Sequence, residues 1–194
     1  MHKKFVLASQ SPRRRMMLEW AELRFDIMVK HTHEIVPEGM AAEDVPVHIA
    51  HTKAQALIED GSFQRYEHDA PVLAADTVVV LDGQIIGKPA DRDEAIRTLT
   101  ALSGKEHRVI TGVVIKSSTK EVAFSAITRV WFHELSPEQI AFYVDKYQPY
   151  DKAGAYAIQE WIGVVGIEKI EGDFYNVMGL PVSRVIQELK QFGL

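Results

Sequence analysis

Residues 72–86 read Val-Leu-Ala-Ala-Asp-Thr-Val-Val-Val-Leu-Asp-Gly-Gln-Ile-Ile, and this stretch decides the fold class. Its first ten residues are apolar except for Asp76 and Thr77, which predicts a long buried strand. Asp82-Gly83 is a strong type I′ hairpin signal that leads into a short second strand. A hairpin beside a buried strand makes the predicted sheet mixed rather than purely parallel.

Strands and helices interleave on both sides of this hairpin. The predicted strands cover residues 5–8, 25–29, 108–116, 121–132, 163–170 and 173–177. The predicted helices cover residues 12–22, 43–59, 91–102, 136–147 and 181–192. Asp91 with Glu94, and Ser136 with Gln139, have the spacing of helix-capping pairs. The pattern predicts an α/β fold in which helices flank a mixed sheet, as one domain or two joined lobes.

Composition narrows the class of protein. The 194 residues are 46% hydrophobic and 25% charged, which is typical of a soluble globular chain. There is no cysteine, so a thiol nucleophile and a Cys-ligated zinc are excluded, and a cytoplasmic location is expected. The net charge of -5 argues against bulk nucleic-acid binding. No apolar stretch approaches the roughly 20 residues of a membrane helix.

The segment Ser9-Gln10-Ser11-Pro12-Arg13-Arg14-Arg15 places cations at a helix start. With Ser11 as N-cap, Arg13 and Arg14 oppose the helix dipole at a cost of roughly 0.3–1 kcal/mol each. An anion would reverse this cost, because free N–H groups, two hydroxyls and guanidinium groups would converge on it. The alternative is a solvated basic helix end.

Two charged residues interrupt apolar patterns. Lys53 falls in a helical stripe with Val45, Ile49 and Leu57, so it either extends to the rim or points into a cleft. Asp76 lies in the middle of the long strand, where a carboxylate must be paired, hydrogen-bonded or bound to metal. Such carboxylates are typical of catalytic sites and of Mg²⁺ ligands, although an Asp at a strand end can also cap a loop.

The remaining candidate site residues are weaker signals when each is considered by itself. Gly87-Lys88-Pro89 can direct Lys88 from a sharp turn, and the amide of Gln159 can recognise a base edge. Glu34 can supply an oxygen ligand to Mg²⁺, whereas its neighbours His31 and His33 lack a third histidine partner. His107 is expected to be structural.

These segments together resemble the Maf family. The matching blocks, in family order, are residues 7–14, 75–79, 87–89, 103–107, 111–112, 151–159 and 176–181. They span nearly the whole chain, so the resemblance implies a single Maf-like domain over residues 1–194. It also implies a fold like that of inosine triphosphatases, with two lobes and a central cleft, a divalent metal (Mg or Mn) and, in many members, a homodimer.

The resemblance further implies a nucleoside triphosphate pyrophosphatase that cuts dTTP and UTP into monophosphate and pyrophosphate. Asp76 matches the family's proton acceptor, and the phosphate-handling positions match Ser9, Arg13, Arg14, Lys53 and Lys88. Substrate choice is linked to Arg14, Thr77 and Gln159. Ser11 is also expected to contact the substrate. The expected catalytic residues are Asp76, Lys53 and Glu34, and the expected metal ligands are Asp76 and Glu34.

Two other functions remain open. A nucleotide-binding regulator of septum formation without turnover would keep the cations but would not need Asp76 and Glu34. A structural or interaction domain would leave the ordered series of matching blocks unexplained. The sequence does not decide whether Asp76 is a base or a metal ligand.

Overall fold

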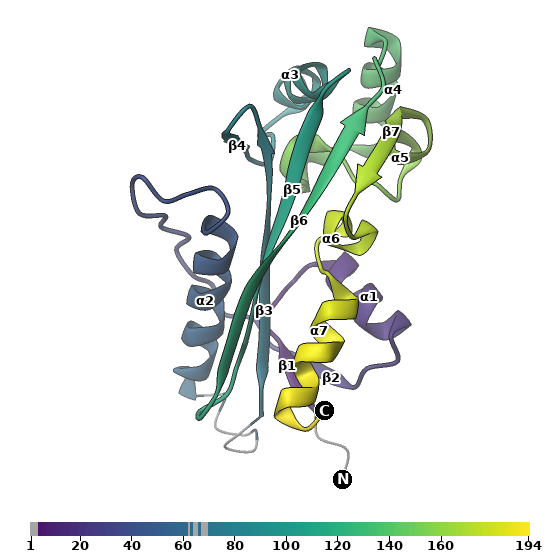
Figure 1. Cartoon of the computed structure of the whole chain (residues 1–194). Coiled ribbons are helices and arrows are strands. Elements are labelled where there is room, and N and C mark those ends of the chain that lie inside the picture. The colour runs from purple at the N-terminus through teal and green to yellow at the C-terminus, as the bar shows by residue number, and fades with distance from the viewer. Residues whose placement is uncertain (1–3, 62, 64–65, 67–69) are drawn as a thin grey trace. The chain divides into compact units, whose positions relative to one another are not determined.

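The computed structural model describes residues 4–61, 63, 66 and 70–194 (Figure 1). The chain divides into two units. The first unit comprises Met1–Asp76, Thr111–Ala126 and Gly179–Leu194, and the second comprises Thr77–Ile110 and Ile127–Met178. Two units agree in number with the two expected lobes, whereas a cleft between them stays a prediction. No helix in the described part of the chain is long and apolar enough to cross a membrane.

Seven strands form one sheet, and its strand directions are mixed as expected. The strands are β1 (Phe5–Leu7), β2 (Phe25–Ile27), β3 (Val72–Leu81), β4 (Gln84–Ile86), β5 (Glu106–Lys116), β6 (Glu121–Phe132) and β7 (Ile167–Glu171). Their order is β2-β1-β3-β5-β6-β7, and β4 pairs with β3. β1 is parallel to both β2 and β3, whereas β3 with β4 and β6 with β7 are antiparallel. The predicted α/β class is therefore confirmed.

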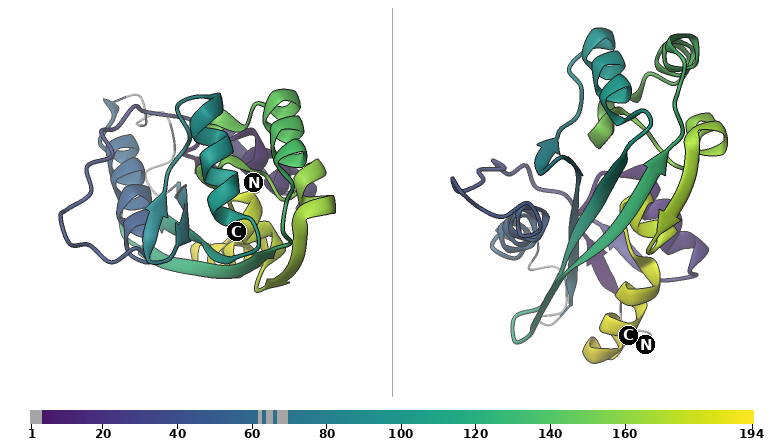
Figure 2. Two further views of the ribbon diagram at one scale, coloured as in Figure 1. Left: turned by 90° about the horizontal axis from the view of Figure 1, so that it is seen from above. Right: turned by 45° about the horizontal axis from the view of Figure 1, so that its top comes forward.

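Seven α-helices accompany the strands in the described residues. They are α1 (Pro12–Trp20), α2 (Val45–Ile58), α3 (Arg92–Leu102), α4 (Pro137–Tyr147), α5 (Trp161–Gly166), α6 (Phe174–Met178) and α7 (Val182–Leu189). Three 3₁₀ turns are η2 (Pro149–Asp151), η3 (Ala153–Ala155) and η4 (Lys190–Phe192). In Figure 1 and the right-hand view of Figure 2, α2 and α7 lie on opposite sides of β3.

The core of the first unit follows from the two-residue period of its strands. Alternate residues of β1, β3 and β5 face α2 and bury small or branched side chains against it. This cluster contains Val6, Ala8, Val72, Ala74 and Val114 from the strands and Ala50, Ala54 and Leu57 from the helix. Small alanines on both surfaces allow the helix to pack closely against the sheet.

Local signals place the ends of most elements. Asp82 and Gly83 form the predicted turn between β3 and β4, with positive φ angles of 51° and 81°. The Asp91 carboxylate accepts from the Glu94 amide at 2.8 Å and starts α3. At α4, Ser136 and Gln139 make both hydrogen bonds of the predicted capping box. Smaller differences occur at the ends of α1 and α2, which stop before the predicted limits.

One predicted strand, at 173–177, is wrong, and the one at 163–170 is confirmed only in its second half. Residues 161–166 form α5, so β7 begins only at Ile167, and residues 174–178 form α6. Short apolar runs do not distinguish a strand from a buried helix. At α6 the deciding interaction is local, because the Asp173 carboxylate accepts from the Tyr175 amide at 2.7 Å and from the Asn176 amide at 3.2 Å. This carboxylate caps the helix start and outweighs the β-propensity of the aromatic residues that follow.

Candidate active site

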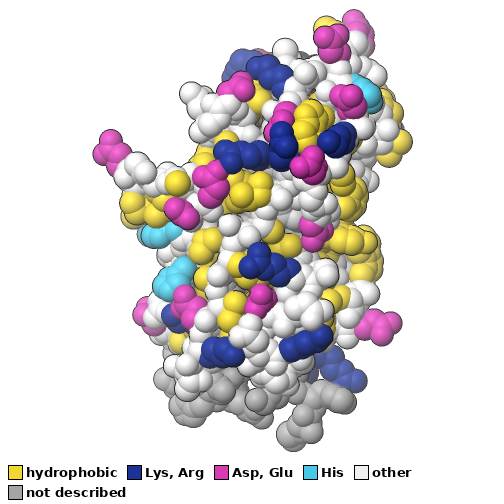
Figure 3. Space-filling model, in the orientation of Figure 1, with side chains coloured by type: hydrophobic (Ala, Val, Ile, Leu, Met, Phe, Trp, Pro, Cys, Tyr) yellow, Lys and Arg dark blue, Asp and Glu magenta, His cyan; other side chains and the backbone are white. Residues whose placement is uncertain are grey.

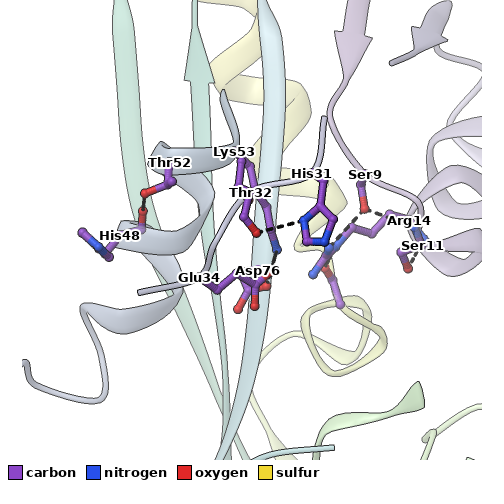
Figure 4. A network of polar contacts seen from close by, with 11 residues as sticks. Ser9, Ser11, Arg14, His31, Thr32, Glu34, His48, Thr52, Lys53 and Asp76 are labelled. Carbon is purple, nitrogen blue, oxygen red and sulfur yellow. Dashed lines mark hydrogen bonds and ion pairs between the residues drawn. The ribbon is translucent and has the colours of Figure 1, made fainter. Parts of the chain in front are cut away.

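Three charged side chains converge in the first unit. The ammonium nitrogen of Lys53 lies 2.8 Å from Oε1 of Glu34 and 2.8 Å from Oδ1 of Asp76. Figure 4 shows the lysine extending from α2 toward both carboxylates. The Lys53 and Asp76 side chains are only 20% and 17% exposed, whereas Glu34 is 50% exposed. One cation therefore holds two acids together at the boundary between core and solvent.

The register of β3 explains why Asp76 meets Lys53. Asp76 follows Val72 and Ala74 at two-residue spacing, so it lies on the face that α2 covers. Lys53 adjoins Ala54 and lies one turn from Ala50, both of which belong to the same packed cluster. The ammonium contacts both carboxylates at this boundary, and the predicted entry of the Lys53 side chain into a cleft stays a prediction.

A glycine on β5 allows α2 to lie this close to the sheet. A Cβ atom at Gly112 would lie 2.2 Å from the carbonyl carbon of Pro46 and 2.2 Å from the amide nitrogen of Val47. Backbone atoms cannot be displaced as cheaply as a flexible side chain. Gly112 is therefore required for the position of the helix that carries Lys53.

A second group of polar side chains surrounds the start of α1. Ser11 is the N-cap, and its hydroxyl accepts from the Arg14 amide at 3.4 Å. The Arg14 side chain folds back, with Nη1 donating to the Ser9 hydroxyl at 3.2 Å and Nε donating to the Gly179 carbonyl at 2.8 Å. Arg13 is half-buried beside it. The Arg14 guanidinium and the Ser9 hydroxyl thus lie together at the start of α1, whereas convergence of the whole set on an anion stays a prediction.

The two groups share one electrostatic environment. Burial lowers the pKa of Arg14, Asp76 opposes that shift, Arg13 adds to it, and Glu34 opposes it. An arginine remains protonated at neutral pH despite such a shift. The Asp76 and Glu34 carboxylates therefore contribute to holding the partly buried guanidinium charge, and an incoming anion would meet that charge at the same place.

The donor set fits a hard divalent cation. Glu34 and Asp76 already share one cationic nitrogen, and carboxylate oxygens are the ligands that Mg²⁺ and Mn²⁺ prefer. Mg²⁺ commonly binds through one or two carboxylates and completes its coordination with substrate phosphates and water. Within residues 4–61, 63, 66 and 70–194, no three His, Asp or Glu side chains form a ready-made metal cluster. The pair is therefore suited to a metal that arrives with an anionic substrate.

The other expected residues belong to the second unit. Thr77 follows Asp76 in β3 and is half-buried, whereas Lys88 and Gln159 are exposed. The turn that carries Lys88 is joined to the segment before Gln159, because the Gly154 amide donates to the Gly87 carbonyl at 3.1 Å. The structure thus connects the Lys88 turn and the Gln159 segment within one unit.

The histidines are placed as expected. His107 is buried, with Nε2 2.7 Å from the Tyr156 hydroxyl and its ring packed edge-on against Phe132. Burial lowers its pKa to about 4, so the ring is neutral at physiological pH. The rings of His31 and His33 lie 6.0 Å apart on the exposed segment before Glu34.

The sequence did not predict two elements of the site. The Gly179 carbonyl that fixes Arg14 lies 165 positions away in the chain, and only its place in the last matching block marked it. The second is the buried hydroxyl of Tyr143, which contacts the turn that carries Gln159. No spacing in the chain connects a helix residue near 143 with that turn.

Comparisons with known proteins identify the family of the chain. A family model described as "Maf-like protein" matches residues 4–192. A dTTP/UTP pyrophosphatase of Porphyromonas gingivalis W83 is 48% identical over 191 residues, which is 98% of this chain and 94% of that protein. A dTTP/UTP pyrophosphatase of Parabacteroides distasonis is 46% identical over 190 residues, 97% of this chain and 96% of that protein. The solved Ham1 protein of Staphylococcus aureus is 12% identical with a TM-score of 0.43, over 67% of this chain and 72% of that one, which is too low to define the fold.

Proposed function

Because this chain belongs to the Maf family, we propose that it is a nucleoside triphosphate pyrophosphatase that hydrolyses dTTP and UTP to monophosphate and pyrophosphate. The names of the relatives, at 46–48% identity over nearly the full chain, support the substrates. The observation that carries the proposal is the contact of one lysine with two carboxylates beside a partly buried arginine. This arrangement provides both a base and cations for phosphate chemistry.

In this proposal, water attacks the α-phosphorus in line with the bond to the β-phosphate. A new O–Pα bond forms, the bond from Pα to the bridging oxygen breaks, and pyrophosphate leaves with that oxygen. Asp76 accepts the proton of the attacking water or orients that water through a metal. Lys53 holds Asp76 in place through the 2.8 Å contact and offsets the negative charge that gathers in the transition state.

We assign Glu34 and Asp76 as the ligands of a divalent cation, Mg²⁺ or Mn²⁺. When bound, such a cation neutralises charge on the phosphate oxygens and on the leaving pyrophosphate. The exposed side of Glu34 leaves it accessible to a cation carried by the substrate, while Asp76 remains mostly shielded.

Phosphate binding is assigned to the start of α1 and to Lys88. Ser9, Ser11, Arg13 and Arg14 present hydroxyls, guanidinium groups and helix N–H groups within a few residues of one another. An arginine held at both Nε and Nη1 loses little further freedom when it binds phosphate. Lys88 supplies a further cation from its turn in the second unit.

Base choice is assigned to Gln159, with Thr77 and Arg14 as further contacts. An amide offers one acceptor and two donors, which complement the O4 and N3–H edge shared by thymine and uracil. Cytosine reverses the donor and acceptor on that edge. A fixed amide would therefore leave polar groups unpaired with CTP, at a cost of about 1–3 kcal/mol each when buried.

The face drawn in Figure 3 does not gather its cations into the one-sided cluster that bulk nucleic-acid binding needs. On the face drawn in Figure 3, Lys and Arg side chains are interspersed with Asp and Glu. Arg129, for example, pairs with both Glu106 and Glu171. We therefore propose a small nucleotide as the partner. From the family resemblance we also propose a single Maf-like domain over residues 1–194 and assembly as a homodimer. A cytoplasmic location is proposed from the absence of cysteine.

A panel of nucleoside triphosphates tests the proposed function. Purified protein should release pyrophosphate from dTTP and UTP faster than from CTP, ATP and GTP, and only with Mg²⁺ or Mn²⁺ present. Orthophosphate as first product, or full activity in excess chelator, would contradict the α-phosphorus mechanism. Tight nucleotide binding without turnover would favour a non-catalytic regulator instead.

A further inference from the structure

The hydroxyl of Tyr143 contacts both ends of the turn that carries Gln159. Tyr143 lies on α4 and is fully buried. Its oxygen accepts from the Ala157 amide at 3.1 Å and donates to the Glu160 carboxylate. Residues 157 and 160 flank Ile158 and Gln159, so one buried oxygen fixes the turn on either side of the proposed base-reading residue.

The turn itself leaves only Gln159 exposed. The Glu160 amide donates to the Ala157 carbonyl at 3.0 Å and closes the turn. Ala157 and Ile158 are both buried, whereas the Gln159 side chain is exposed. The place and direction in which the Gln159 side chain leaves the turn therefore depend on how firmly the backbone of residues 157–160 is held.

Two further contacts surround the turn. A Cβ atom at Gly163 would lie 1.7 Å from the Ile158 carbonyl oxygen, so the backbone of α5 packs directly against the turn. On its other side, the ammonium of the buried Lys152 lies 3.7 Å from Oε1 of Glu160. The Glu160 carboxylate thus has a cation on one oxygen and the Tyr143 hydroxyl on the other.

We propose that Tyr143 is a positioning residue that sets the base selectivity of this enzyme by fixing the Gln159 turn. This inference rests on the proposed function. An amide distinguishes thymine from cytosine only while its oxygen and nitrogen stay in one orientation, since a rotated amide matches the reversed edge. A turn released from Tyr143 would displace the Gln159 side chain from the base edge and loosen its hold in one orientation, so discrimination would decline while the phosphate chemistry in the first unit stayed intact.

The test is a comparison of Tyr143→Phe with Tyr147→Phe. The second tyrosine lies one turn later on α4 and stacks on Tyr143 at 5.0 Å, so its substitution also removes one hydroxyl from the same helix. In Tyr143→Phe the ratio of kcat/KM for dTTP to that for CTP should decrease about tenfold relative to wild type. In Tyr147→Phe this ratio should stay at its wild-type value.

A double-mutant cycle with Gln159→Ala separates positioning from general damage. If Tyr143 acts through Gln159, adding Tyr143→Phe to Gln159→Ala should leave the dTTP to CTP ratio unchanged. Amide hydrogen exchange at Ala157 gives a readout that does not depend on turnover, and it should become faster in Tyr143→Phe only. If Gln159→Ala removes discrimination but Tyr143→Phe neither changes the ratio nor speeds exchange, the positioning role is wrong.

The same data distinguish this inference from the proposed function. A wild-type protein that discriminates poorly between dTTP and CTP, or does not turn them over, would refute the proposed function. In that case slow amide exchange at Ala157 in wild type and fast exchange in Tyr143→Phe would still establish that Tyr143 fixes the turn. Equal exchange in both proteins would refute this.

Discussion

The ammonium of Lys53, on α2, lies 2.8 Å from Oδ1 of Asp76, on β3. The same nitrogen contacts Glu34, which comes from an irregular segment between β2 and α2. The Lys53 ammonium thus connects a helix, a strand and a loop.

Asp76→Asn keeps the shape of the side chain and removes its charge and basicity. If Asp76 accepts the proton of the attacking water, kcat should decrease about 10²- to 10⁴-fold with an unchanged fold. Steady-state kinetics with dTTP and a melting curve check this result. Asp26→Asn is a matched control, because Asp26 pairs with Lys4 at 3.6 Å on the exposed part of the same unit. Near-normal kcat in Asp76→Asn would exclude a catalytic role.

Lys53→Met keeps the apolar stem and removes the ammonium. We expect kcat/KM to decrease about 10²- to 10³-fold, as for loss of a preorganised charge contact. The free energy of unfolding should also decrease, by about 1–3 kcal/mol, because Asp76 is only 17% exposed and loses its cationic partner, whereas water can solvate the half-exposed Glu34.

Lys30→Met serves as the control for that variant. Lys30 pairs with Asp60 at 3.0 Å and is 44% exposed, so its loss should affect neither rate nor stability by much. Equal activities of the two lysine variants would remove Lys53 from the site.

Gly112→Ala tests the close packing of α2 on β5. The new methyl group would overlap the backbone of Pro46 and Val47, so the helix must shift. The expected loss in unfolding free energy is about 1–3 kcal/mol, and activity should decrease because Lys53 moves away from Asp76. Urea denaturation of this variant and of Gly61→Ala gives the comparison, since a Cβ at Gly61 meets nothing within 4 Å. Equal stabilities would show that the sheet adapts to the methyl group.

His107→Gln tests the pH dependence of stability. Burial lowers the pKa of His107 from 6.5 to about 4, so the unfolded chain takes up this proton at a higher pH than the folded chain. The contribution is fully present above pH 6.5 and is lost as the pH falls toward 4. Between roughly pH 7 and 5, wild type should lose about 2 kcal/mol of unfolding free energy through this group.

The glutamine variant should show correspondingly less pH dependence, because it does not titrate. His133→Gln, a change at an exposed residue, should retain the wild-type slope. Urea denaturation at the two pH values measures both. A wild-type slope in His107→Gln would assign the pH dependence to other groups.

Much of the fold could be predicted because its signals are local. The strand over 72–81, its Asp-Gly turn and the caps at Ser11, Asp91 and Ser136 depend on neighbouring residues alone. The predicted strand at 173–177 was wrong, and the one at 163–170 was confirmed only from Ile167 onward, because short apolar runs are ambiguous. At α6 a single Asp173 cap decided the outcome.

The site was predictable only in part for the same reason. Asp76 and Lys53 interrupt regular apolar patterns, so the sequence marked them as unusual. Their contact depends on the register of β3 against α2, which Gly112 sets from another strand. Tyr143 interrupts no pattern, because a buried tyrosine on a helix is ordinary, and its importance appears only through the partners of its hydroxyl.

The central claim is that water attacks the α-phosphorus, and oxygen-isotope labelling tests it most directly. Wild-type protein would hydrolyse dTTP in ¹⁸O-enriched water with Mg²⁺, and mass spectrometry would locate the label in the two products. Attack on the α-phosphorus should leave one ¹⁸O atom in dTMP and none in pyrophosphate. Label in pyrophosphate, or in released orthophosphate, would place the attack on another phosphorus and contradict the assignment of Asp76, Lys53 and Glu34.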